Sequence, residues 1–402
     1  MNCLRLRRRS LLATMFFCVF TPGVLSWLLM STVPAQAQTQ KVLYNFTGGH
    51  DGQSPQSALT AHAGNLYGTA YSGGLGYGTV FELSPNGGGW TQTVLYAFTG
   101  GIDGKYPAYA SVVFDSAGNL YGSTLEGGTN NSGVIFELSP TGKSWTETVV
   151  YSFCSQFECA DGEYPTSGPI MDSAGNIFGA SANGAFELSP SGGGWNERAI
   201  YGYTGVSENS ATLTMDAAGN LFGIIYIHTP RVEYSKVFEL SPDGSSGWTP
   251  TVLTKFGGIA ANGTLALDKA GNLYGTTIGN SKHDGTVFKL SIGKKGKWEK
   301  KTLHSFQGGM DGDEPWGGIV FDAAGNIYGT TLYGGKHGFG TVFELVPPKR
   351  NGKYTEKILW NFGNKDGAVP VNSLILDDAG NLYGTAMGGG TTGNGVVFEV
   401  TP

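Results

Sequence analysis

The sequence predicts an all-β fold: a seven-bladed β-propeller whose blades are antiparallel sheets of four strands. Three observations favour it. One phrase, first seen as "AGNLYGT" at 63–69, recurs seven times, and two further strand-like phrases accompany each copy. The two ends of the chain also carry complementary parts of one repeat. A long regular period is typical of an architecture in which each unit buries its faces against its neighbours.

The first phrase forms the inner hairpin of each unit. Its glycine recurs at intervals of 44 to 57 residues, at Gly64, Gly118, Gly175, Gly219, Gly271, Gly325 and Gly380. A short apolar run precedes a "DxAGN" turn, and "NLYGT" follows it. Asp hydrogen-bonds its own backbone and Gly adopts the positive φ that a tight reversal needs, so this pattern indicates two antiparallel strands.

The other two phrases supply the third and fourth strands. "VFELSP" at 80–85 is followed by a polar, Gly-rich turn and then by "VLYAF" at 94–98, and both phrases recur in every unit. No segment has a convincing helical period. Four strands cannot bury both sheet faces alone, so seven units arranged radially are expected.

A column of small residues supports a closed ring over an open β-solenoid. The residue seven positions before each anchoring glycine starts the first strand, which lies nearest the axis, where converging blades leave little room. A solenoid would have shorter, more even repeats and capping ends. The seven small residues are Ser57, Ser111, Gly168, Thr212, Thr264, Gly318 and Ser373.

The ends of the chain explain how the ring closes. The repeats open on a fourth-strand phrase, 41–46, and finish on a third-strand phrase, 396–400. Pairing 41–46 with 396–400 completes seven blades and leaves no unpaired joint.

Residues 1–37 lie outside the repeats and resemble a secretory signal. Four arginines precede an apolar run from Leu11 to Met30, and Ala35-Gln36-Ala37 is a small-x-small cleavage site. We therefore expect an exported protein, extracellular or in the periplasm or cell envelope, with a single propeller domain at 38–402. No later run is apolar enough to span a membrane. An uncleaved membrane anchor is the alternative.

Charge and cysteine content narrow the partners. Loss of residues 1–37 removes four of the 25 basic residues and none of the 31 acidic ones, which leaves a net charge of −10. Such a surface argues against nucleic acid as a partner. Cys154 and Cys159 then remain, and a close pair in an exported chain predicts a disulfide. Two cysteines cannot complete a zinc site, and we expect no metal and no cofactor.

Taken together, "DxAGNLYGT", "GTVFELSP", "W…VLYxF" and "GGxDGxxP" resemble the GloVer tandem-repeat family of exported bacterial proteins, over about 40–402. The resemblance implies export and a propeller, and it implies no known activity. The "DxxGNLY" turn is also similar to NHL-type propellers, some of which are lyases or lactonases.

The turns divide between two faces. Turns between strands 1 and 2, and between strands 3 and 4, are nearly uniform and lie on one side. The loops between strands 2 and 3, and those between blades, lie on the other side and vary; we call this side the loop face. Loops freed from a shared structural task can carry function. Its candidate ligand-binding residues are Tyr226, His228, Arg231, Tyr234, His283, His337, Trp316, Tyr106 and Tyr164.

Blade 4 is the clearest case, since its segment 224–236 replaces glycines with "IIYIHTPRVEYSK" and is expected to be a long loop over the channel mouth. The alternative is a loop that only fills its own gap. The "DG" aspartates of the inter-blade loops, Asp51, Asp103, Asp161, Asp311 and Asp366, could ring a cation, but Asx turns before glycine are the favoured interpretation.

The sequence thus favours an exported, non-enzymatic, monomeric propeller that binds a glycan or a protein through the loop face, with no catalytic residue assigned. A hydrolase or lyase using the histidines and acids of that face is one alternative. A structural envelope protein is another. Propellers host many functions, so the fold does not choose among them.

Overall fold

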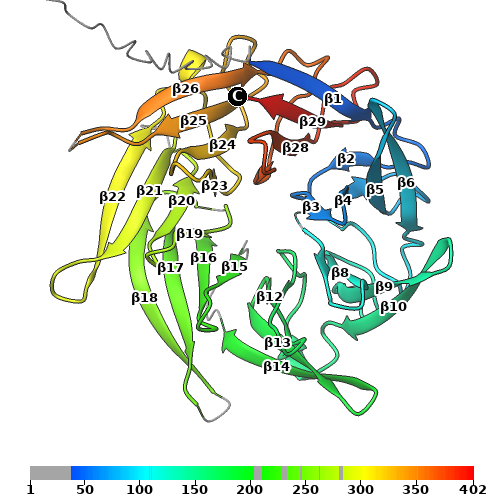
Figure 1. The fold of residues 1–402 in the computed structure, drawn as a ribbon. Helices are drawn as coiled ribbons and strands as arrows, with labels where there is room; N and C mark the ends of the chain where they lie inside the picture. Colours follow the sequence, from blue (N-terminus) through cyan, green and yellow to red (C-terminus); the bar gives the residue numbers. More distant parts are fainter. Residues whose placement is uncertain are drawn as a thin grey trace, which may run out of the picture. The chain divides into compact units, whose positions relative to one another are not determined.

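Seven antiparallel sheets surround a central axis in the computed structural model (Figure 1). The structure describes residues 38–107, 109, 111–202, 211–228, 233–244, 247–261, 263–279, 284–350 and 352–402. The signal sequence predicted for 1–37 lies outside them. The predicted all-β, seven-bladed propeller is confirmed.

The blades follow one another in chain order. Blade 1 contains β2 (Gln53–Pro55), β3 (Thr60–His62), β4 (Asn65–Ser72), β5 (Thr79–Asn86) and β6 (Gly89–Ala97). Blade 2 contains β7 (Val113–Phe114), β8 (Leu120–Thr124), β9 (Val134–Thr141) and β10 (Ser144–Ser152). Blade 3 contains β11 (Ile170–Met171), β12 (Ile177–Ser181), β13 (Gly184–Ser191) and β14 (Gly194–Gly202). Blade 4 contains β15 (Ala211–Met215), β16 (Leu221–His228), β17 (Glu233–Pro242) and β18 (Trp248–Gly257).

The later blades repeat this order. Blade 5 contains β19 (Ala266–Leu267), β20 (Leu273–Thr277), β21 (Thr286–Ile292) and β22 (Trp298–Ser305). Blade 6 contains β23 (Val320–Phe321), β24 (Ile327–Thr331), β25 (Thr341–Val346) and β26 (Thr355–Asn361). Blade 7 contains β27 (Ile375–Leu376), β28 (Leu382–Ala386), β29 (Val396–Thr401) and β1 (Thr39–Asn45). Two short 3₁₀ turns, η1 (Phe157–Cys159) and η2 (Gly309–Asp311), lie in inter-blade loops.

The two ends of the chain share blade 7. Strand β1 pairs antiparallel with β29, from Thr39 opposite Thr401 to Asn45 opposite Val396 (Figure 1). On the inner side, Thr385 Oγ1 donates to the main-chain oxygen of Ser57 at 2.9 Å, which joins blade 7 to blade 1. The predicted ring closure is confirmed.

The "DxAGN" turn is fixed by its own side chains. Asp115 Oδ1 accepts the main-chain N–H groups of Ala117 and Asn119, both at 2.9 Å, and Gly118 has φ +87°. The aspartate ties down the hairpin, and the glycine takes the left-handed conformation. In blade 1, Ala61 replaces the aspartate and the turn is a tighter hairpin between β3 and β4.

The second glycine of "AGNLYGT" serves packing instead. A Cβ on Gly68 would lie 2.7 Å from Phe81 Cζ. Phe81 is fully buried, and its ring meets Phe46 of the neighbouring blade edge-on, with 5.2 Å between centroids. Because this arrangement recurs around the ring, paired phenylalanines fill the space between successive blades.

The column of small residues lies where neighbouring blades touch. A Cβ on Gly318 would lie 2.5 Å from both Ser373 Oγ and the main-chain oxygen of Thr264, and all three residues belong to this column. Crowding near the axis is therefore confirmed. Cys154 and Cys159 form the predicted disulfide. No helical segment of the described residues has the length and apolar character needed to cross a bilayer.

Candidate binding face

The inter-blade loops interlock with the preceding blade. Tyr106 and Tyr164 each precede a proline and have φ of +59° and +50°. The N–H of Tyr106 donates to the main-chain oxygen of Tyr77 at 2.8 Å, and that of Tyr164 donates to Ser132 at 2.8 Å. Residues other than glycine rarely adopt positive φ, and such strain persists only where neighbouring contacts hold it. The equivalent left-handed residues of the other "DG" loops are Ser54, Glu314 and Val369.

Exposed hydrophobic side chains concentrate on the loop face. Among the described residues, eleven large hydrophobic side chains are exposed, and nine of them lie in strand 2–3 or inter-blade loops. The other two members of this set are Val252, on the outer strand β18, and Ile292, at the end of the third strand β21. The nine are Leu75, Tyr77, Ile102, Tyr109, Phe157, Tyr164, Met310, Tyr333 and Phe339. Exposed apolar side chains that form a contiguous patch mark interaction sites, so members of this set that lie together are candidate contacts.

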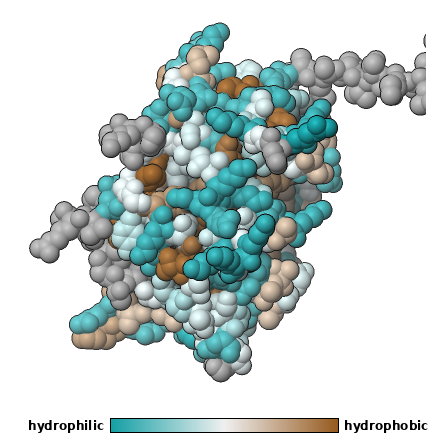
Figure 2. Space-filling view, turned by 90° about the vertical axis from the view of Figure 1, so that its left-hand side faces the viewer, coloured by the Kyte–Doolittle hydropathy of each residue, from teal (hydrophilic) through white to brown (hydrophobic). Residues whose placement is uncertain are grey.

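The outer side of the ring offers a contrast. Figure 2 shows this side, near β18 and β22, as largely hydrophilic with a few separate hydrophobic residues. Scattered apolar residues of that kind are ordinary on protein surfaces.

Three tyrosines form a cluster on the loop face at the boundary of blades 1 and 2. Tyr71 and Tyr106 are stacked, with ring centroids 4.9 Å apart and an interplanar angle of 15°. Tyr77 lies beside them, 6.3 Å from Tyr106. We call these three residues the tyrosine cluster. Lys105 Nζ lies 5.6 Å from the centre of the Tyr106 ring and 2.9 Å from Glu126 Oε2.

The surroundings of Tyr71 favour its protonated phenol. Burial raises the pKa of Tyr71, and the neighbouring Tyr106 adds to the shift. The cluster therefore presents flat, amphipathic rings with hydroxyl groups, flanked by a balanced Lys105–Glu126 pair. Such a surface can stack on an apolar face and hydrogen-bond at its edge.

The expected long loop at 224–236 is wrong in its main part. Its residues extend strands β16 and β17, so only 229–232 connect them. The run of three isoleucines and Tyr226 at 224–227 has high β propensity and continues the ladder. In that ladder Tyr226 faces Ser235 and Ile227 faces Tyr234, which puts Tyr226 and Tyr234 on opposite faces of the sheet.

The blade 4 candidates therefore do not form one group. Tyr226 donates its hydroxyl to Glu233 Oε1 at 2.9 Å, and Lys255 Nζ lies 5.4 Å from the ring centre of Tyr234. His228 ends β16, and its side chain lies outside the described residues, as do Arg231 and His283.

The remaining candidates are distributed around the ring. His337 is exposed in the loop between β24 and β25, and Trp316 is half-buried just before β23. Tyr164 lies before β11 and is 38 % exposed. The structure brings Tyr106 together with Tyr71 and Tyr77, which were not among the predicted binding residues. Tyr109 was missed, although its position directly before the second blade was a usable signal.

The "DG" aspartates stabilise their own loops. Asp103 accepts the N–H of Thr99 at 2.7 Å, the hydroxyl of Thr99 at 2.6 Å and the hydroxyl of Tyr96 at 3.0 Å. Asp51 and Asp161 make comparable bonds. This arrangement agrees with the turn interpretation and not with a ring of cation ligands at the channel mouth.

Two cavities lie toward the opposite, uniform face. One of about 840 Å³ is lined by the first strands of blades 2, 3 and 4 and by turn residues 216–219. The other, of about 790 Å³, lies between the first strands of blades 5 and 6. Their linings combine apolar side chains with aspartates such as Asp216, whose Oδ1 already accepts two main-chain N–H groups.

The repeat itself identifies the family. The Gloeobacter/Verrucomicrobia repeat matches the chain over residues 28–187, 93–277 and 208–402. The chain belongs to this repeat family. No similar curated protein was found.

Solved structures show the same fold at low identity. A polysaccharide lyase of family PL25, an ulvan lyase bound to -[GlcA(1-4)Rha3S]-, matches with a TM-score of 0.56 and 13 % identity, over 90 % of this chain and 95 % of that one. The polysaccharide lyase Uly1 matches with a TM-score of 0.52 and 13 % identity, over 86 % and 89 %. A putative gluconolactonase has 16 % identity over 72 % and 87 %, with a TM-score of 0.40.

Proposed function

We propose that this Gloeobacter/Verrucomicrobia repeat protein binds a polysaccharide on its loop face, with the tyrosine cluster as the main contact. The observation that carries the proposal is the placement of nine of the eleven exposed large hydrophobic side chains of the described residues on that face. A protein that needed only to close its loops would use glycine, asparagine or serine there.

The chemistry of the cluster suits a sugar. Pyranose rings have an apolar C–H face and polar edges, and tyrosine offers a flat apolar ring with a hydroxyl group at little cost in side-chain entropy. The Lys105–Glu126 pair beside the rings supplies a donor and an acceptor. The left-handed backbone at Tyr106 and its bond to Tyr77 hold the platform rigid, which limits the entropy lost on binding.

The charge of the chain favours a neutral polymer. Its net charge is −6 for the whole sequence, which opposes the approach of a polyanion. The likeness to polysaccharide lyases supports the class of ligand, because those proteins act on polysaccharides with the same fold.

Elimination chemistry on the same face is the second candidate. The ulvan lyase with the same fold favours this candidate. So does the position of Lys105 beside Tyr106, since a cation there can bind the carboxylate of an acidic sugar. The raised pKa of Tyr71 works against it, because a buried phenol is a poor proton acceptor at neutral pH.

Affinity electrophoresis in gels containing neutral polysaccharides tests the proposal. We expect retardation of the protein by at least one such polymer and at least a tenfold loss of affinity in Tyr106→Ala. Ile292→Ala is the matched control, since Ile292 is 63 % exposed but ends the third strand of blade 5, at the turn on the opposite face. Equal binding by Tyr106→Ala and the parent protein would contradict the proposal. Release of unsaturated uronate ends from an acidic polysaccharide would favour the lyase instead.

A further inference from the structure

The outer junctions between blades share one arrangement. At four junctions of the described residues, an aromatic side chain near the end of an outer strand donates a hydrogen bond to the "DG" aspartate that follows it. The pairs are Tyr44–Asp51 at 2.9 Å, Tyr96–Asp103 at 3.0 Å, Tyr151–Asp161 at 2.7 Å and Trp360–Asp366 at 2.8 Å. A Glu or Gln of the next outer strand completes each junction.

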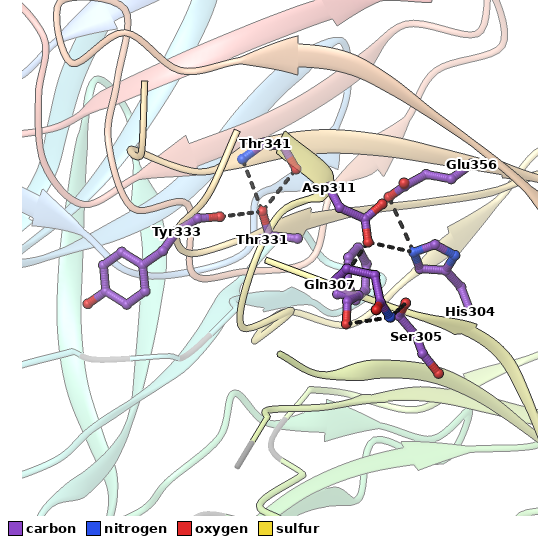
Figure 3. A network of polar contacts seen from close by, with 9 residues as sticks. His304, Ser305, Gln307, Asp311, Thr331, Tyr333, Thr341 and Glu356 are labelled. Carbon is purple, nitrogen blue, oxygen red and sulfur yellow. Dashed lines mark hydrogen bonds and ion pairs between the residues drawn. The ribbon is translucent and has the colours of Figure 1, made fainter. Parts of the chain in front are cut away.

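The junction between blades 5 and 6 departs from this arrangement. Here His304 of β22 takes the place of the aromatic donor, and it points at the carboxylates of Asp311 and Glu356 (Figure 3). His304 Nε2 lies 3.6 Å from Asp311 Oδ2 and 3.6 Å from Glu356 Oε1. Both separations are too long for a hydrogen bond.

Two of these atoms are buried without a partner. His304 Nε2 and Glu356 Oε1 have almost no solvent-accessible surface and make no hydrogen bond in the described structure. A buried polar atom without a partner costs free energy, so such an atom needs an explanation. At the four junctions with tyrosine or tryptophan, the aromatic side chain donates a hydrogen bond to the aspartate. At this junction His304 Nε2 and Glu356 Oε1 face each other without a hydrogen bond.

Burial also changes how these two groups ionise. Burial raises the pKa of Glu356 to about 9, and the adjacent Asp311 adds to the shift. Burial also lowers the pKa of His304, despite the neighbouring Asp311. Both shifts have the same cause, since burial disfavours the charged form of each group.

We propose that His304 Nε2, Asp311 Oδ2 and Glu356 Oε1 bind one divalent transition metal ion of the zinc class. Ligand atoms of the three residues all lie within 4.8 Å of one another. At metal–ligand distances of about 2.0–2.2 Å, two ligand atoms of a tetrahedral ion are roughly 3.4 Å apart. His304 Nε2 lies 3.6 Å from each of the two carboxylate oxygens, which is close to that value. An imidazole combined with two carboxylates suits zinc and its neighbours, and water would supply the fourth ligand.

The surrounding structure positions the ligands. The main-chain N–H of Gln307 donates to Asp311 Oδ2 at 2.7 Å, which orients that carboxylate from within its own loop. The ring of His304 meets Phe306 edge-on, with centroids 4.7 Å apart. Since β22 belongs to blade 5 and β26 to blade 6, the ion would join two blades. The site uses no residue of the tyrosine cluster, so the inference goes beyond the proposed function.

The chain offers its own controls. Glu147 and Glu197 occupy the position of Glu356 at two other junctions, and each also has a buried oxygen without a partner. Their junctions contain Tyr96 and Tyr151 in place of histidine, so they supply no nitrogen ligand. His304→Tyr gives this junction the same tyrosine–aspartate pair that three other blade junctions already have. The variant is therefore expected to fold.

Calorimetric titration of Zn²⁺ into the full-length, chelator-stripped protein tests the proposal. We expect one equivalent to bind, a rise in Tm of about 2–4 °C with saturating zinc, and at least a tenfold loss of affinity in His304→Tyr and Glu356→Gln. Glu147→Gln should bind as the parent does. The proposal fails if the parent binds no zinc, or if His304→Tyr and the parent bind it equally. Melting of each variant without metal establishes that it is folded.

Discussion

Gln40 Nε2 donates a hydrogen bond to the main-chain oxygen of Asp366 at 3.1 Å, although 326 positions separate the two residues. Gln92 makes the same bond to Asp51 at the next junction, also at 3.1 Å. Glu147 and Glu197 occupy this place at two further junctions. An amide is neutral, and a carboxyl group resembles it only while protonated. The comparison predicts that these two glutamates carry a proton in the folded protein.

The first prediction is a loss of stability as pH rises. Burial raises the pKa of both Glu147 and Glu197 to about 7, and a nearby aspartate, Asp103 or Asp161, adds to each shift. The unfolded chain has the ordinary, lower value, so the folded state binds more protons between about pH 4.5 and 7. The stabilisation is therefore present below pH 4.5 and disappears as pH rises through 7. Urea denaturation at pH 5 and pH 8 measures it.

Variants separate this effect from other titrations. Glu147→Gln should leave the free energy of unfolding unchanged at pH 5. At pH 8 it should raise that free energy by about 1 kcal/mol, after allowance for partial solvent screening. The reverse change, Gln92→Glu, should introduce a pH dependence of the same sign. Identical pH profiles for Glu147→Gln and the parent would contradict the prediction.

The second prediction concerns ring closure. Deleting residues 38–47 removes β1 and Phe46, which is fully buried, so the melting transition should broaden and its Tm should fall. Phe46→Ala alone should cost about 3–5 kcal/mol, as expected for a phenylalanine in a packed core. Scanning calorimetry measures both variants, with Leu75→Ala as an exposed control. An unchanged melt after the deletion would show that the pairing of β1 with β29 is dispensable.

The third prediction tests the packing glycine. Gly68→Ala would put a methyl group 2.7 Å from Phe81 Cζ and 3.1 Å from Ser57 Oγ, and should cost about 1–3 kcal/mol through overpacking. Gly202→Ala is the matched control, because nothing lies within 4 Å of its Cβ position. Chemical denaturation of both variants decides the matter; equal stabilities would disprove the steric explanation.

The fourth prediction concerns the disulfide. The closed loop between Cys154 and Cys159 is short, so the chain-entropy model gives it about 2 kcal/mol. Cys154→Ser with Cys159→Ser should lower the free energy of unfolding by that amount. Thiol labelling of the untreated protein should find neither residue. Labelling of both, or a double variant as stable as the parent, would count against the prediction.

The sequence predicted the ring because the repeated phrases encode local events. The aspartate of the "DxAGN" turn hydrogen-bonds the main chain of its own turn, and the glycine of "YGT" leaves space for a phenylalanine ring. Each copy of the repeat therefore specifies its own hairpin and its own packing. The segment 224–236 was misjudged because missing glycines were taken as the sign of a long loop. Its isoleucines and Tyr226 favour strand and instead extend β16, which pairs with β17.

The candidate sites were harder to predict, because side chains from different repeats meet only after folding. Tyr71 lies near the end of β4 and Tyr106 lies in the following inter-blade loop, so their stacking depends on how two separate segments meet. His304, Asp311 and Glu356 likewise come from two repeats. A signal was present: aligning the "VLYxF" phrases shows histidine at a position where five other units have tyrosine or tryptophan and one has threonine.

Because β1 pairs with β29, the ring closes only after the last strand has been synthesised. The ribosome makes β1 first and β29 last, so at about 5–20 residues per second β1 waits roughly 20 to 70 s for its partner. Throughout this interval Leu43 and Phe46, both buried in the finished ring, stay on an unpaired strand edge. Such an edge is a template for pairing with other chains. The incomplete chain therefore carries a pairing edge that the finished ring no longer has.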